Sequence, residues 1–135
     1  MIWTAIKRIR AKYDYIPWEE FEQTKFTTTD NKPWSCCHAS LKLPLFVITA
    51  CCPYSIDINH QANCELHGLL QWHLQSAFPL AITEEIVGRS ADGQWKELSW
   101  AVTGINEDQA LEVGRVFHQW AIFKFDGKEK QVLQC

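Results

Sequence analysis

The sequence is poor in several features that mark whole classes of proteins. Its longest uncharged and mainly apolar run, residues 43–56, is too short to cross a bilayer and contains two prolines. The formal net charge is only −3, which predicts no strong attraction to nucleic acid or to anionic lipid. No glycine-rich phosphate loop is present either. The composition therefore predicts no membrane association and makes nucleic acid an unlikely partner.

The six cysteines lack the C-x-x-C spacing of thioredoxin-like and zinc-ribbon sites. Four of them form two adjacent pairs, Cys36-Cys37 and Cys51-Cys52, and sequence neighbours are poorly placed to bond each other. The charges near the N-terminus follow the first apolar residues, unlike those of a secretory signal. We therefore expect a cytoplasmic protein whose reduced cysteines serve mainly as small buried side chains. A disulfide scaffold is the alternative.

The 135 residues, 47% hydrophobic and 21% charged, are typical of a globular chain with a core of its own. This length predicts a single domain over residues 1–135. Within it, residues 1–44 are expected to form a helix and strand segment that packs on an α+β core over 45–135. Seven tryptophans are unusual for this size.

The N-terminal segment is predicted to begin with an amphipathic helix over residues 2–13. This stretch contains Lys7, Arg8, Arg10 and Lys12 and no acid, which leaves 9 basic and 16 acidic residues elsewhere. Such a basic stripe is usually the solvated face of a docked helix. Binding of nucleic acid or of an acidic protein partner through this stripe is the alternative.

Hydrophobic periodicity and turn residues predict a regular succession of elements. A short helix begins near residues 16–21, and a strand follows over 23–29. From there the prediction is a buried strand over 45–50, a helix from Ser55 or Asp57 to about Ala77, strands over 81–89 and 95–102, a helix from Asn106 to His118, and strands over 120–125 and 130–133. The order β-α-β-β-α-β predicts an α+β protein of the ferredoxin-like split βαβ type. Its mostly antiparallel sheet carries two helices on one face and ends in a C-terminal hairpin.

A set of short spaced motifs runs through this core. The motifs are Ile48-Thr49-Ala50, Pro53, Ser55, Asn63, Trp95-x-Glu97-x-Ser99 and Phe117-x-Gln119-x-Ala121-Ile122. Over residues 45–125 the chain resembles a bacterial domain-of-unknown-function family, number 3293. The resemblance implies a bacterial, cytoplasmic protein and no particular activity. The chain departs from the family at Cys51 and Cys52, where the family typically has an aromatic residue and an asparagine.

The strand over 95–102 presents two chemically different faces. Leu98, Trp100 and Val102 point one way and must meet the helices. Trp95, Glu97 and Ser99 point the other way and, together with Gln119 and Ser55, form the predicted ligand-binding platform. The aromatic N-terminal segment is expected to cover this face of the sheet, because the apolar side chains on it would otherwise be exposed to water. A pocket between that segment and the sheet would satisfy both expectations.

The turn after the first core strand is a second candidate site. Cys51 and Cys52 lie where a strand ends and a helix begins, and a helix N-terminus can depress the pKa of a thiol. They are the candidate catalytic residues of a thiol-dependent enzyme or redox sensor. The alternative is that both pack as small side chains and Ser55 caps the helix.

The long helix has an apolar and a polar side at 100° per residue. The predicted core face consists of Ala62, Leu66, Leu69, Leu70, His73 and Ala77. On the opposite side His60, Cys64 and His67 recur at i, i+4 and i+7, which could supply three ligands to zinc or copper. A solvated face or a subunit interface explains the same pattern, and no fourth ligand is assignable. We therefore predict no metal and no cofactor.

These observations favour a small protein that acts by binding a small molecule or a protein partner and not by catalysis. Catalytic activity is the alternative. A homodimer is expected, because a sheet of this type leaves an unpaired edge strand.

Overall fold

A computed structural model describes residues 16–35, 41–127 and 129–135. The helix predicted over residues 2–13 lies outside them. The elements are α2 (Trp18–Gln23), β1 (Lys25–Thr27), β2 (Leu45–Thr49), the short 3-10 helix η1 (Pro53–Ser55), α3 (His60–Ala77), β3 (Ile82–Arg89), β4 (Lys96–Thr103), α4 (Glu107–Val116), β5 (Ala121–Phe125) and β6 (Lys130–Gln134). Within these residues no helix is both long and apolar enough to traverse a bilayer.

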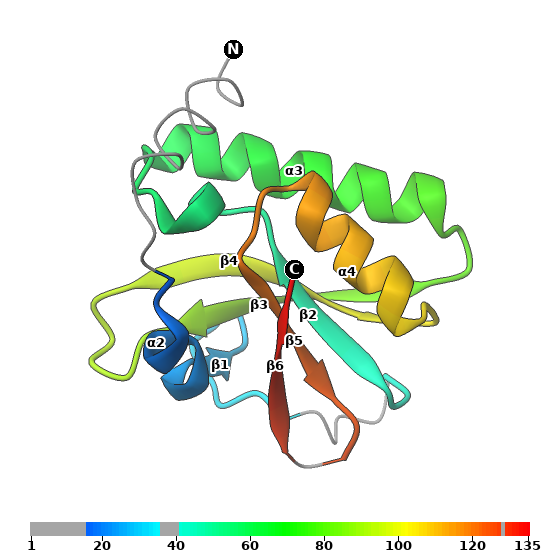
Figure 1. The fold of residues 1–135 in the computed structure, drawn as a ribbon, viewed down its shortest axis with the longest axis horizontal. Coiled ribbons are helices and arrows are strands. Elements are labelled where there is room, and N and C mark those ends of the chain that lie inside the picture. Colours follow the sequence, from blue (N-terminus) through cyan, green and yellow to red (C-terminus); the bar gives the residue numbers. More distant parts are fainter. Residues whose placement is uncertain (1–15, 36–40, 128) are drawn as a thin grey trace.

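All six strands form one antiparallel sheet in the order β1-β3-β4-β2-β5-β6. The buried strand β2 lies inside the sheet between β4 and β5, as its continuous apolar run predicts. Helices α3 and α4 lie together on one face, and α2 lies on the other (Figure 1). The prediction of an α+β protein with a mostly antiparallel sheet is confirmed.

The main core lies between the sheet and the two long helices. Leu66, Leu70 and Leu74 of α3 and Val113 of α4 pack against apolar side chains from the strands. Trp100 and Val102 of β4 join them, as the alternation of that strand predicts. A capping box closes the start of α4 at Asn106, where the sequence predicts that this helix begins. There Asn106 Oδ1 accepts from the N–H of Gln109 at 2.8 Å, and Gln109 Oε1 accepts from the N–H of Asn106 at 2.9 Å.

A second, smaller core covers the other face of the sheet. Phe26 of β1 makes edge-to-face contacts with Trp34, Phe123 and Phe125, with ring centroids 5.2–5.9 Å apart. Leu41, together with Leu45 and Val47 of β2, belongs to the same cluster. The part of the N-terminal segment that the structure describes therefore covers this face, as expected from its aromatic residues.

The start of the long helix differs from the prediction. Asn59 is the N-cap of α3, and its Oδ1 accepts from the N–H of Ala62 at 2.8 Å. Neither Ser55 nor Asp57 caps α3, because the chain first makes the η1 turn. Tyr54 and Ser55 have φ angles of 52° and 60° there, which an α-helix does not accommodate.

The buried face of α3 is also rotated relative to the predicted one. Leu66, His67, Leu70 and Leu74 are its buried residues. Leu69, which the helical wheel assigns to the core, is 54% exposed. His67, assigned to the polar side, is 6% exposed. The side chains of the sheet and of α4 that pack against α3 determine which of its faces is buried. A helical wheel drawn from the sequence of α3 alone carries no information about those side chains.

Two helical glycines offer a matched test of packing. A Cβ added to Gly114 in α4 would lie 2.6 Å from Cys135 Sγ and 2.8 Å from Ile122 Cγ2, whereas one added to Gly68 in α3 has no atom within 4 Å. We expect Gly114→Ala to destabilise the fold by roughly 1–3 kcal/mol through overpacking. Gly68→Ala should stabilise it by about 0.5–1 kcal/mol through helix propensity. Urea unfolding of both variants measures the change in the free energy of unfolding. A change of the same sign in both variants would contradict the described packing of α4.

Candidate functional site

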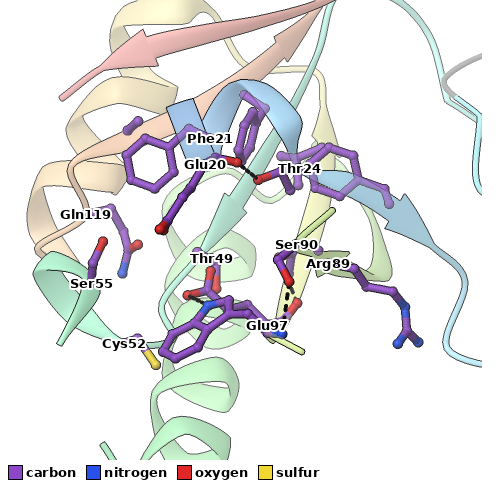
Figure 2. Close-up of a pocket in the computed structure, with 17 residues that line it drawn as sticks. Glu20, Phe21, Thr24, Thr49, Cys52, Ser55, Arg89, Ser90, Glu97 and Gln119 are labelled. Carbon is purple, nitrogen blue, oxygen red and sulfur yellow. Dashed lines mark hydrogen bonds between the residues drawn. The ribbon is translucent and has the colours of Figure 1, made fainter. Parts of the chain in front are cut away.

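A pocket of about 300 Å³ lies between the α2–β1 segment and the second face of the sheet (Figure 2). The five side chains of the predicted platform all line it: Trp95, Glu97, Ser99, Gln119 and Ser55. Four lining residues come from the N-terminal segment: Glu20, Phe21, Thr24 and Phe26. The sheet and the loop after β2 contribute the rest of the wall, which includes Thr49, Cys52, Arg89 and Phe123.

Glu97 of β4 is the partly buried carboxyl group of the pocket. Its Oε1 accepts a hydrogen bond from Trp95 Nε1 at 2.9 Å. Burial raises the pKa of Glu97 from its usual 4.5 to about 7, against the opposing effect of the Trp95 hydrogen bond. A carboxyl group that titrates near neutral pH can exchange a proton or bind a cation under ordinary conditions.

The two cysteines after β2 have the opposite of the expected electrostatics. Burial raises the pKa of the Cys51 thiol to about 12 and also raises that of Cys52. The Cys51 thiol lies 3.5 Å from the carbonyl of Leu98. Only Cys52 of the pair lines the pocket. Because the thiolate is the reactive form, these environments disfavour a nucleophilic role at neutral pH.

The loop that carries Cys52 is held in an unusual backbone conformation. Cys52, Tyr54 and Ser55 have φ angles of 46°, 52° and 60°, a region that non-glycine residues seldom occupy. The N–H of Cys52 donates to Asn63 Oδ1 at 2.9 Å, and that of Tyr54 donates to the carbonyl of His118 at 2.7 Å. Contacts from two other elements therefore fix the loop beside the pocket, as is common at functional sites.

Gln119 links this loop to the pocket. Its side chain is nine-tenths buried, and its Nε2 donates to the carbonyls of Cys51 and Phe117 at 3.1 and 3.3 Å. Because both partners are acceptors, the amide nitrogen must face them and the amide oxygen must face away. Within the described ranges Oε1 has no hydrogen-bond partner, and Figure 2 shows the side chain at the pocket wall next to Ser55.

The helix over the pocket is fastened by one lysine. Lys130 Nζ of β6 donates to the carbonyls of Phe21, Glu22 and Thr24, at 3.1, 2.9 and 2.5 Å, at the end of α2. The same ammonium lies 5.2 Å from the ring centroid of Phe123. Its desolvation lowers the pKa of Lys130 below the usual range. The Phe21 carbonyl also accepts from the N–H of Thr24 at 3.2 Å, so the lysine adds to the bonds that close the end of the short helix.

The structure does not bring the three candidate metal ligands together. His60 Nε2 and Cys64 Sγ lie 3.4 Å apart at the surface. The buried His67 instead stacks on Trp100, with ring centroids 4.7 Å apart, and its Nε2 lies 2.7 Å from Glu85 Oε2. The assignment of His67 to the polar side of the helix was therefore wrong. Across residues 16–35, 41–127 and 129–135, no group of three His, Cys, Asp or Glu side chains could hold a metal ion.

More than half of the chain matches a known protein family. The model of the family described as "Protein of unknown function (DUF3293)" matches residues 48–122. The chain belongs to the DUF3293 family. No curated protein and no solved structure matches it.

The matched DUF3293 segment contains the five predicted platform residues and the Cys51-Cys52 pair. The residues that close the pocket from above, Glu20 to Phe26, lie outside it, as does Phe123. The N-terminal segment was expected to cover this face of the sheet, but Glu20 was not predicted to line a pocket there. An exposed glutamate on a short helix gives no signal of that position.

Proposed function

We propose that this DUF3293 protein binds a small molecule in the pocket between α2–β1 and the sheet, and that it acts by binding and not by catalysis. The observation that carries the proposal is the convergence of Trp95, Glu97 and Gln119 on one aromatic-lined cavity of about 300 Å³. That volume is at the lower end of the range for small-molecule sites, roughly 300–1,000 Å³. Unpaired polar atoms in a mainly apolar wall are what such sites use for specificity.

The raised pKa of Cys51 and of Cys52 supports binding over the alternative of thiol chemistry. A role in nucleic-acid or protein binding for the basic stretch over residues 2–13 has no support from the described residues, since that stretch lies outside them.

A variant of Gly88 offers a direct test of the pocket. A Cβ at Gly88 would make ordinary contacts of 3.5–3.7 Å with Phe26, Ser99 and Thr24, so Gly88→Ala should keep both fold and cavity. Gly88→Leu should fill the cavity. We expect NMR titration with a mixed set of small charged and neutral aromatic compounds to shift the Trp95 indole N–H in the wild type and in Gly88→Ala. Gly88→Leu should remain folded and show no shift.

Persistence of the same shifts in a folded Gly88→Leu variant would locate binding elsewhere and contradict the proposal. So would the absence of any shift from every compound in the set.

We further propose a ferredoxin-like split βαβ arrangement for residues 45–125, which the strand order β5-β2-β4-β3 and the two connecting helices α3 and α4 support. A bacterial, cytoplasmic setting is part of the same proposal. The free thiols of Cys51, Cys52, Cys64 and Cys135 suit a reducing compartment.

The edge position of β6 supports a homodimer. A solution mass equal to one chain at high concentration would contradict a homodimer.

A further inference from the structure

The pocket wall has more free hydrogen-bond acceptors than free donors. The hydroxyl groups of four lining residues already donate within the protein, at 2.6–3.3 Å: Thr24, Thr49, Ser90 and Ser99. The indole N–H of Trp95 donates to Glu97, and the amide nitrogen of Gln119 donates to backbone carbonyls. The polar N–H and O–H groups of the wall are therefore largely committed before a ligand arrives.

The one cationic side chain in the described lining points away from the cavity. Arg89 Nε donates to Thr27 Oγ1 at 2.8 Å, and Figure 2 shows the guanidinium turned away from the cavity. The Ser55 hydroxyl remains available and can either donate or accept.

The acceptors, in contrast, are open. Among the residues that the structure describes, Glu97 Oε2, Gln119 Oε1 and the Glu20 carboxylate have no hydrogen-bond or ion-pair partner. Figure 2 shows Glu20 reaching from α2 into the pocket, toward the side where Gln119 and Thr49 lie. These oxygens are accessible from the cavity and are free to accept hydrogen bonds from a ligand or from water.

The aromatic part of the wall suits positive charge as well. Phe21, Phe26, Phe123 and Trp95 line the cavity, and the faces of such rings attract cations. Phe123 already lies 5.2 Å from the ammonium of Lys130. The lining contributes two carboxyl groups and one averted guanidinium, and the nearby Lys130 ammonium is bonded to three backbone carbonyls. The cavity therefore favours a cation once Glu97 is ionised.

We propose that the pocket takes a small organic cation, a primary amine or guanidinium group on an apolar or aromatic body, held by Glu97, Gln119 and Glu20. This inference rests on the proposed function and specifies the chemical class of the ligand. The cation donates N–H bonds to the three open acceptors, and its apolar body packs against the aromatic rings.

The ionisation of Glu97 gives this recognition a pH dependence. The charged and titratable groups around it are Glu20 on α2, Arg89 on β3, and Cys51 and Cys52 after β2. Since the pKa of Glu97 is about 7, its ionised fraction falls roughly tenfold from pH 8 to pH 6. A bound ammonium group stabilises the carboxylate, so binding near pH 7 should release a proton.

Three probes that share a phenylethyl body and differ in the charge of the end group test the preference: 2-phenylethylamine, 2-phenylethanol and 3-phenylpropionate. We expect NMR or calorimetric titration at pH 8 to give an affinity for the amine at least tenfold above that for the alcohol, with no binding of the carboxylate. Affinity for the amine should fall roughly tenfold at pH 6, although the amine itself stays protonated over this range. Glu97→Gln should lose at least tenfold in amine affinity together with the pH dependence, and the exposed Glu65→Gln should change neither.

Equal or tighter binding of the alcohol or the carboxylate at Trp95 would overturn the cation preference and leave small-molecule binding in place. Failure of all three probes would overturn the cation preference, and the mixed compound set with Gly88→Leu would then decide separately on the proposed function.

Discussion

Replacing Glu97 by Gln is expected to make the protein more stable above pH 7, by up to about 3 kcal/mol. The folded protein raises the pKa of Glu97 from 4.5 to about 7 by burial, and each pKa unit corresponds to about 1.36 kcal/mol. Between these two pH values the folded state binds the proton more tightly than the unfolded state does. The contribution of Glu97 to stability is therefore fully present below about pH 4.5 and is lost as the pH rises through about 7.

The neutral amide introduced by Glu97→Gln would imitate the protonated carboxyl group at every pH. We therefore expect thermal unfolding of Glu97→Gln at pH 8 to show a Tm higher by on the order of 10 °C, and the difference to vanish near pH 4.5. Glu65→Gln, on an exposed position of α3, is the matched control and should follow the wild type throughout. A constant difference between Glu97→Gln and wild type over this pH range would show that Glu97 is not desolvated.

The second large effect is expected at Leu70, whose side chain is fully buried in the main core. Leu70→Ala should lower the free energy of unfolding by roughly 2–5 kcal/mol, because it removes buried apolar contacts and leaves a cavity. The adjacent Leu69 is 54% exposed, so Leu69→Ala should change stability by no more than about 0.5 kcal/mol.

Urea denaturation of both variants gives the comparison, since the substitution is identical and the positions are neighbours. Comparable losses at Leu69 and Leu70 would mean that α3 presents the face predicted by its helical wheel, or that Leu69 is covered by another chain. The solution mass of the Leu69→Ala variant distinguishes these two cases.

Much of the sheet could be predicted from local chemistry. The alternation along β4 separates Trp100 and Val102, in the main core, from Glu97 and Ser99, in the pocket wall. The apolar run of β2 between two prolines predicts an inner strand, and Asn106 is a cap that depends on near neighbours alone. For these elements the determining interactions lie within a few residues in the sequence.

Interactions between distant segments determine the features that were predicted wrongly or missed. His67 is buried because Trp100 offers its ring for stacking and Glu85 lies 2.7 Å away, and both come from strands remote in sequence. The start of α3 depends on the η1 turn, where Tyr54 is bonded to His118. Glu20 became a lining residue only because the short helix α2 is anchored above the sheet.

The anchor at Lys130 links the two ends of the described chain. One ammonium group holds the last carbonyls of α2 and lies against Phe123, so α2 cannot lift from the pocket without breaking several polar contacts together. The position of α2 over the cavity therefore depends on the C-terminal hairpin, although Lys130 does not line the cavity. Acetylation of this lysine, or a fusion that disturbs β6, would act on the pocket from outside it, which favours leaving the C-terminus untagged in binding studies.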